Sequence, residues 1–200
     1  MFDELKSRLT ALSEPIMLVG NAVPDGDSAS SLATILSFLR ENGKESYIYF
    51  VHPPPKFLEW MFEKKDFHED ILNDYKSLVV VDDYVDSSRL SVPIKEGIEV
   101  INIDHHVRSD VSDGRIRFAG QKVQGEHNTM LYWSATPATA CVLIDAGIVH
   151  PFLWVGLATD TKFFKVKNIT TSIYVHRLQQ ALMKEDVRLT DILAGKMLSN

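Results

Sequence analysis

The sequence is poor in cysteine and in long apolar runs. Its 200 residues include a single cysteine, Cys141, which excludes an internal disulfide and a cysteine-based zinc site and fits a reducing compartment. No apolar run approaches the roughly 20 residues that a membrane helix needs, and the amphipathic N-terminus lacks the apolar segment of a signal peptide. We therefore expect a cytoplasmic protein with no membrane partner.

Positive charge, which binds nucleic acid, is also scarce. Lys and Arg together number 21, against 27 Asp and Glu, and the formal net charge is -6. Binding to long duplex DNA depends on neutralising many phosphates, so we expect no such partner for an acidic chain. A small phosphate ligand that is held locally or through a metal ion remains compatible with this charge.

Helical and strand-like segments alternate along the chain, which predicts the α/β class. Strands are predicted at 16–19, 46–51, 78–81 and 100–103, and their continuous apolar character is typical of a parallel sheet buried on both faces. Helices are predicted at 2–12, 28–41, 57–62, 69–75, 137–146, 151–159, 172–183 and 189–198, whereas 115–133 has no clear pattern. We expect a three-layer fold with a mostly parallel sheet flanked by helices, as one domain over 1–200.

Aspartates and histidines gather where the predicted strands end. The first strand is followed by Asn21, Asp25 and Asp27, the third by Asp82 and Asp83, and the fourth by Asp104, His105 and His106; Asp160 follows the helix predicted at 151–159. Each cluster alone has a plainer interpretation as a turn, a helix cap or surface histidines. Four clusters at successive element ends instead predict a site for Mn²⁺ or Mg²⁺, because crowded carboxylates repel one another unless a cation neutralises them.

In their order and spacing, these residues resemble the four motifs of the DHH phosphoesterases. The matching segments are Pro24-Asp25-Gly26-Asp27, Asp82-Asp83, Asp104-His105-His106, and Asp160-Thr161 followed by Phe164. A further similar segment is Ala135 to Ala140, and the resemblance spans about Ile16 to Leu193, with a metal-site core at about 16–165 and C-terminal helices at about 171–198.

The resemblance implies a metal-dependent phosphoesterase, since the family includes enzymes that act on short RNA, cyclic dinucleotides, pAp and pyrophosphate. The expected substrates are small nucleotide phosphate esters: short oligonucleotides, linear or cyclic dinucleotides, or pAp. The alternative is a nucleotide-binding or regulatory protein on a degenerate DHH scaffold, with little or no turnover.

The resemblance also implies ligand sets for two ions. Asn21, Asp25 and a strand-end aspartate would hold one ion, and Asp27, the same aspartate, His105 and Asp160 would hold the other. Two residues compete for the shared position: Asp82 ends the apolar run, whereas Asp83 has the family's usual spacing to a downstream arginine, here Arg89, and that spacing favours Asp83.

The other implied roles concern the substrate. His106 would contact the phosphate and help to orient the leaving group, and Asp104 would brace the two histidines. The candidate substrate contacts, chosen as phosphate-binding groups near the motifs, are His106, Arg108, Arg89, Lys162 and Lys165.

The chain departs from the family pattern in three ways. Asn21 stands where the family usually has histidine, and an amide oxygen is a poorer ligand for Mn²⁺ than imidazole, which puts the ion on that side in question. Lys162 stands where the family commonly has glycine. No glycine-rich motif of a second, substrate-binding domain is present, so a second copy of the chain or a partner subunit is a candidate to complete the pocket.

Overall fold

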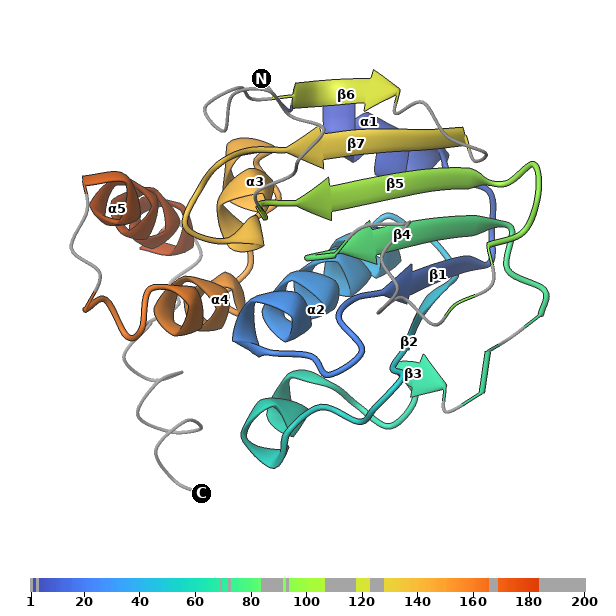
Figure 1. The fold of residues 1–200 in the computed structure, drawn as a ribbon, viewed down its shortest axis with the longest axis horizontal. Helices are drawn as coiled ribbons and strands as arrows, with labels where there is room; N and C mark the ends of the chain where they lie inside the picture. The colour runs from blue at the N-terminus through green and yellow to red at the C-terminus, as the bar shows by residue number, and fades with distance from the viewer. Residues whose placement is uncertain are drawn as a thin grey trace.

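Short apolar runs form the strands at the centre of the molecule. The computed structural model describes residues 2, 4–68, 70–71, 73–83, 92, 94–106, 118–122, 128–165 and 169–183. Its strands are β1 (Ile16–Val19), β2 (Ser46–Tyr49), β3 (Phe67–His68), β4 (Ser77–Val81), β5 (Glu99–Asp104), β6 (Phe118–Lys122) and β7 (Asn128–Trp133). They form one sheet in the order β3-β2-β1-β4-β5-β7-β6 (Figure 1). Every neighbouring pair is parallel except β6 with β7, which confirms the mostly parallel sheet.

Helices flank this sheet, as the α/β class requires. They are α1 (Glu4–Ala11), α2 (Gly26–Glu41), the 3-10 helix η1 (Lys56–Met61), α3 (Thr139–Asp145), α4 (Leu153–Asp160) and α5 (Ile169–Met183). Helix α2 begins where the Asp25 side chain accepts hydrogen bonds from the first-turn amides. It ends before Gly43, whose φ of 73° suits a glycine. Within the described ranges, every helix is too short or too polar to reach across a lipid bilayer.

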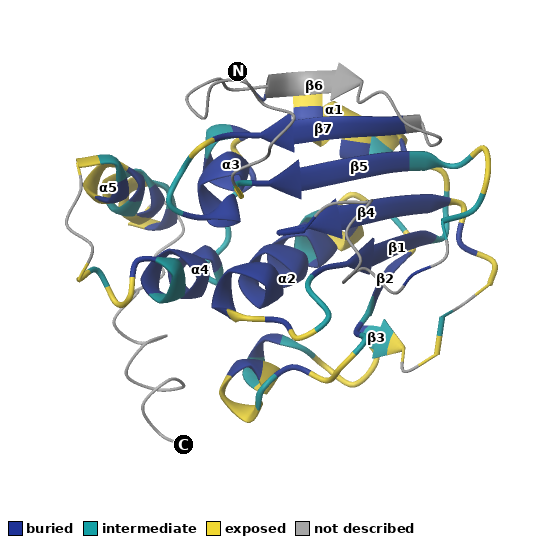
Figure 2. Cartoon of the chain, viewed as in Figure 1, coloured by how far each residue is buried: buried dark blue, intermediate teal, exposed yellow. Residues whose placement is uncertain are grey.

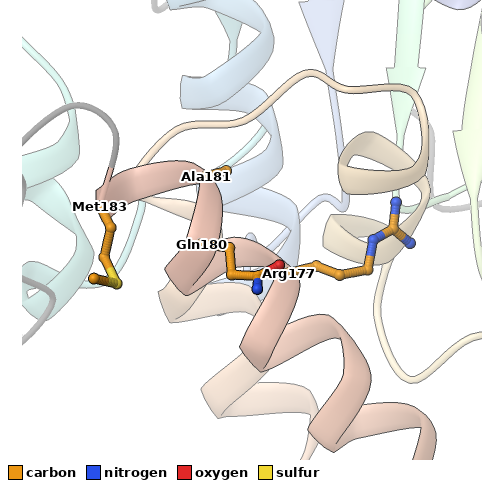
Figure 3. A pocket seen from close by; sticks show the side chains of 4 residues that line it. All are labelled: Arg177, Gln180, Ala181 and Met183. Carbon is orange, nitrogen blue, oxygen red and sulfur yellow. The ribbon is translucent and has the colours of Figure 1, made fainter.

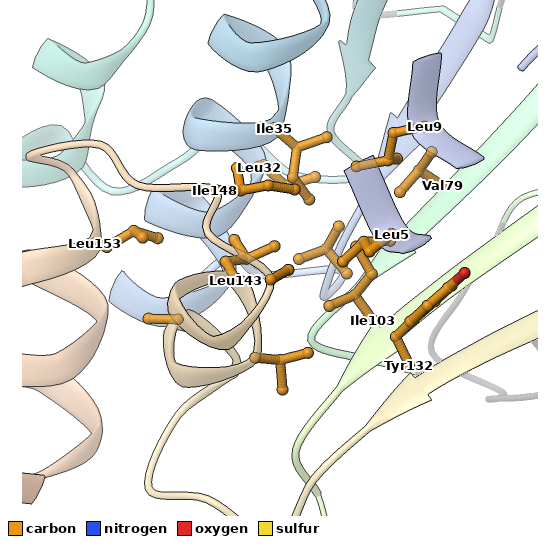
Figure 4. Packing of buried hydrophobic residues seen from close by; sticks show 14 of the residues in the cluster. Leu5, Leu9, Leu32, Ile35, Val79, Ile103, Tyr132, Leu143, Ile148 and Leu153 are labelled. Carbon is orange, nitrogen blue, oxygen red and sulfur yellow. The ribbon is translucent and has the colours of Figure 1, made fainter. Parts of the chain in front are cut away.

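The main core lies between the helices and one face of the sheet. Figure 4 shows Leu5 of α1, Leu32 of α2 and Leu143 of α3 gathered over Val79 and Ile103 of the sheet. A smaller cluster on the opposite face is formed mainly by the alternate strand residues and by Tyr75 and Val92 from connecting segments. The strands β1, β4 and β5 and the first three turns of α2 are almost wholly buried (Figure 2). Burial of each such Leu or Val side chain stabilises the fold by roughly 1.5–3 kcal/mol.

The sequence patterns located most elements but not all of them. Residues 70–71 and 73–75 form a bend and a turn rather than a helix. The prediction of a short helix at 69–75 is therefore wrong for the described residues. The unassigned stretch 115–133 contains β6 and β7, and β3 follows η1 without having been predicted. The helix expected at 189–198 lies outside the described residues.

The strand order places a switch in chain direction next to β1. The connection from β1 leads to β2 on one side, and the chain later returns to β4 on the other side. In open α/β sheets a ligand site forms beyond the carboxyl ends of the strands at such a point. The parallel register aligns these ends, since Val19 pairs with Val80 and Val81 pairs with Ile103. Residues that follow β1, β4 and β5 are therefore brought to one edge.

Candidate metal centre

His105 lies at the middle of this edge, surrounded by carboxylates from three elements. Its Nε2 is 3.2 Å from Asp160 Oδ2, 3.5 Å from Asp82 Oδ1 and 3.8 Å from Asp27 Oδ2. Its Nδ1 lies 3.0 Å from the carbonyl oxygen of Thr136. A carbonyl only accepts, so Nδ1 carries a proton, and the ring would present its lone pair at Nε2 once that nitrogen is deprotonated. That buried nitrogen has no hydrogen-bond partner.

Asp27 supplies the most deeply buried carboxylate of the site. It lies in the first turn of α2 and is 0% exposed. Its two oxygens accept from the first amides of α3, with Oδ2 2.5 Å from Thr139 N and Oδ1 3.0 Å from Ala140 N. Burial in the first place, and then repulsion from Asp160, raises the pKa of Asp27 to about 7. A nearby cation would stabilise the ionised form of this carboxyl, which burial and repulsion disfavour.

Space for Asp27 depends on a glycine in the adjacent helix. A Cβ at Gly156 of α4 would lie 2.5 Å from Asp27 Oδ1 and 2.7 Å from the hydroxyl of Ser30. Helices α2 and α4 therefore pack closely only because this position has no side chain. The same packing brings Asp160, at the end of α4, to the histidine.

Asp82 is held from two sides beside His105. Its Oδ1 accepts from the hydroxyl of Thr139 at 2.9 Å, and its Oδ2 accepts from Nδ2 of Asn21 at 3.0 Å. Burial and the charge of Asp27 raise the pKa of Asp82 well above its ordinary value. The φ of Asp82 is 59°, a left-handed conformation that aspartate tolerates better than most residues and that turns the chain at the end of β4.

The geometry favours Asp82 over Asp83 as the shared aspartate, contrary to the spacing argument. Two groups of His and Asp residues among the described residues have ligand atoms within 4.8 Å of one another: Asp82, His105 and His106, and Asp27, His105 and Asp160. Asp83 is in neither group, although it is 6% exposed and lies next in sequence.

Asp104 positions both histidines through a single oxygen. Its Oδ1 lies 2.8 Å from His105 N, 3.1 Å from His106 N and 2.8 Å from His106 Nδ1. This hydrogen bond to Asp104 is the main reason why the pKa of His106 is raised. The His106 side chain is 46% exposed, whereas that of His105 is 13% exposed. His106 is therefore the histidine that an incoming substrate can reach.

The site fits a divalent cation by the chemistry of its donors. Burial lowers the pKa of His105, but the close approach of Asp160 at 3.2 Å and the charges of Asp27 and Asp160 outweigh burial and raise it to about 9. A proton on Nε2 thus occupies the place where three carboxylates converge, which is the place that a cation would take. Oxygen and imidazole donors without thiolate suit Mg²⁺, Mn²⁺ or similar ions.

Asn21 and Asp25 lie beside this group but outside it. Asp25 is exposed, and its Oδ1 accepts from Asp27 N and Ser28 N, both at 3.0 Å, as the cap of α2. Asn21 donates to Asp82 as described above. Neither ligand group among the described residues contains Asp25.

The predicted phosphate contacts are only partly described. Arg89 and Arg108 lie outside the described residues. Lys162 and Lys165 are exposed in the turn after α4. Lys162 has a φ of 52°, followed by Phe163 at 56° and Phe164 at 61°. The position where the family commonly has glycine is thus left-handed here, at a cost of about 1–2 kcal/mol for a residue with a side chain.

Some functional groups escaped the sequence interpretation. Thr136, Thr139 and Ala140 act through a backbone carbonyl, a hydroxyl and backbone amides, and Gly156 acts by having no side chain. The similarity of Ala135 to Ala140 to a family segment was the one available signal for the first three. A pocket elsewhere, on α5, is lined by Arg177, Gln180, Ala181 and Met183 and contains none of the predicted site residues (Figure 3).

Comparison with known proteins agrees with the fold and the motif order. A family model described as the DHH family, N-terminal domain, matches residues 15–150. No curated protein matches the sequence. An exopolyphosphatase-related protein from Bacteroides fragilis has a similar structure, with 17% identity and a TM-score of 0.66 over 100% of this chain and 60% of its own. CDC45 from Entamoeba histolytica is similar over 96% of this chain and 39% of its own, with 16% identity and a TM-score of 0.45. Only the first likeness bears on the fold, and this chain spans 60% of the length of that protein.

Proposed function

The chain belongs to the DHH family, and from this premise we propose that it is a divalent-metal-dependent phosphoesterase that hydrolyses small nucleotide phosphate esters. The observation that carries the proposal is the position of His105, whose unpartnered Nε2 lies within 3.8 Å of three carboxylate oxygens. Asp27, Asp82, His105 and Asp160 would hold the cation, with Mn²⁺ as the expected ion and Mg²⁺ as the alternative. When bound, the cation supplies Lewis acidity toward a phosphoryl group and a source of nucleophilic hydroxide.

The protein's own contribution begins with His106. Because Asp104 accepts from Nδ1 and raises the pKa of His106, the ring keeps a second proton at Nε2 to higher pH than a free histidine does. An N–H at this half-exposed position can donate to a phosphate oxygen and then pass its proton to the leaving oxygen. Asp104 holds the ring in the orientation that this transfer needs.

The remaining residues keep the carboxylates in place before substrate arrives. Thr139 binds Asp27 through its amide and Asp82 through its hydroxyl, so one residue fixes two carboxylates from different elements. Thr136 fixes the tautomer of His105. Such preorganisation lowers the reorganisation that the reaction would otherwise require.

Substrate size follows from the charge and from the family. A formal net charge of -6 disfavours the binding of long nucleic acid, which depends on neutralising many phosphates. Short oligonucleotides, linear or cyclic dinucleotides and pAp are therefore the substrates that we propose. The exposed Lys162 and Lys165, and Arg89 and Arg108 outside the described residues, are the proposed phosphate contacts.

Hydrolysis of a substrate panel with Mn²⁺ tests the proposal. The panel contains pAp, linear and cyclic dinucleotides, short RNA and pyrophosphate, and the wild type is compared with His105→Ala. We expect turnover of at least one nucleotide ester and a loss of more than about 100-fold in the variant, since even groups behind the ligands are usually worth 10–100-fold. His176→Ala, on the exposed side of α5, is the matched control and should retain activity.

The outcomes separate the enzyme from its alternative. Equal rates for wild type and His105→Ala would remove the proposed site. No turnover of any substrate by folded protein would overturn the enzymatic proposal. If calorimetry then showed tight nucleotide binding without product, the nucleotide-binding or regulatory alternative would replace it.

A further inference from the structure

We propose that the resting centre holds one divalent cation, on His105, and that the amide of Asn21 occupies the position of a second. The inference rests on the metal-dependent part of the proposed function and concerns the number of ions. The sequence led us to expect two ions, with the ion on the Asn21 side in question.

The first argument is that both ligand groups converge on one nitrogen. One group is Asp82, His105 and His106, and the other is Asp27, His105 and Asp160. The Nδ1 of His105 is committed to the carbonyl of Thr136, so the ring has a single lone pair, at Nε2. One lone pair binds one ion. Through His105, the two groups therefore offer ligands to one ion rather than marking two sites.

The distances suit an ion at this nitrogen. Ligand atoms bound at about 2.1 Å to one ion lie roughly 3–4 Å apart when they are adjacent in the coordination shell. The carboxylate oxygens nearest to Nε2 are 3.2, 3.5 and 3.8 Å away. Each of these three oxygens thus lies at a distance from Nε2 that suits two ligands of one ion.

The second argument is that the neighbouring position is taken by protein donors. Nδ2 of Asn21 donates to Asp82 Oδ2 at 3.0 Å. The N–H side of the amide therefore faces Asp82, and its partial positive charge lies where a second cation would contact that oxygen.

Asp25 is committed in a similar way. Its Oδ1 accepts from two first-turn amides of α2, both at 3.0 Å. Drawing this oxygen to a cation would uncap the helix, which costs about 1 kcal/mol. A second ion would therefore have to displace the Asn21 amide, would find Asp25 Oδ1 already engaged in the helix cap, and would gain no histidine nitrogen in return.

Manganese stoichiometry tests this inference directly. Metal-free wild-type protein is titrated with Mn²⁺ by calorimetry, and the electron paramagnetic resonance signal of free Mn²⁺ is counted in parallel. We expect one ion per chain, without the spin coupling of two adjacent Mn²⁺ ions. Asn21→His removes the donor and supplies an imidazole, so its stoichiometry should rise to two and spin coupling should appear.

Two further variants complete the design. Asn21→Asp supplies a carboxylate in place of the donor and should likewise bind two ions if the histidine variant does not fold. Asn42→His, at the far end of α2 where the side chain donates to the carbonyl of Phe38, should remain at one ion. Thermal unfolding of each variant establishes that it is folded.

The possible results lead to different conclusions. Two coupled ions in the wild type would overturn the single-ion inference, even if the protein hydrolyses nucleotides. One ion without hydrolysis of any substrate would overturn the enzymatic proposal and support the single-ion inference. One ion in the wild type and in both Asn21 variants would show that Asn21 does not exclude the second ion, and no binding by the wild type would overturn both.

Discussion

Replacing Asp27 by asparagine should stabilise the metal-free protein at pH 8 and lose that effect at pH 5. Asp27 is fully buried, and burial followed by repulsion from Asp160 raises its pKa to about 7 from 3.8. A raised carboxyl pKa means that the folded state binds the proton more tightly. Ionisation therefore costs the wild type stability as the pH rises from about 4 to about 7. At about 1.4 kcal/mol per pKa unit, three units amount to a cost on the order of 4 kcal/mol.

The substitution also removes a favourable contact. Asp27 accepts from Thr139 N and Ala140 N through separate oxygens, whereas asparagine offers one oxygen. One amide then faces an NH₂ group, at a cost of about 1–3 kcal/mol. The net gain at pH 8 is therefore about 1–3 kcal/mol. At pH 5 only about one of the three units has been incurred, on the order of 1.6 kcal/mol, and the lost hydrogen bond offsets it, so the gain disappears.

Thermal and urea unfolding in EDTA at both pH values measure this effect. For a chain of this size, each kcal/mol shifts Tm by roughly 2–4 °C. Mn²⁺ at 100 times its Kd should stabilise the wild type by about 2.7 kcal/mol and the variant far less. Asp74→Asn, at an exposed position, is the control and should show no such pH dependence. A variant that is less stable than wild type at pH 8 without metal, or equally shifted at both pH values, would refute the reasoning.

Three other substitutions test the supports of the site. Gly156→Ala introduces a Cβ 2.5 Å from Asp27 Oδ1. We expect the free energy of unfolding in urea to fall by about 1–3 kcal/mol and Mn²⁺ binding to weaken. Unchanged values would show that α4 can move away. Thr139→Val removes the hydroxyl that Asp82 accepts and should weaken Mn²⁺ binding about 10–100-fold by calorimetry, whereas an unaltered affinity would mean that this contact does not orient Asp82. Lys162→Gly relieves the strain of a φ of 52°. The strain energy exceeds the entropic cost of the more flexible unfolded chain by about 0.5–1 kcal/mol, so Tm should rise by about 1–4 °C. A lower Tm would contradict the claim that Lys162 is strained.

The parts of the fold that follow from local pattern were predictable from the sequence. Continuous apolar runs predicted β1, β4 and β5 to within one residue at each end. Gly43 correctly marked the end of α2. By contrast, β6 and β7 form an antiparallel pair with an irregular register, and β7 joins the sheet through β5. Such long-range pairing leaves little signal in the local sequence.

The same distinction applies to the site. The positions of Asp27, Asp82, His105 and Asp160 along the chain were visible because they follow the element ends, and the structure brings them together. The choice between Asp82 and Asp83 was not visible, because it depends on a left-handed turn at the end of β4. The contribution of Thr139 was hidden as well, since it acts across 112 residues through its backbone amide.

Anomalous diffraction from crystals soaked in Mn²⁺, recorded at the manganese edge, tests the central claim most directly. The account predicts one peak per chain within coordination distance of His105 Nε2 and the carboxylates of Asp27, Asp82 and Asp160. No peak at His105, or a peak held by Asp25 and Asn21 instead, would contradict it.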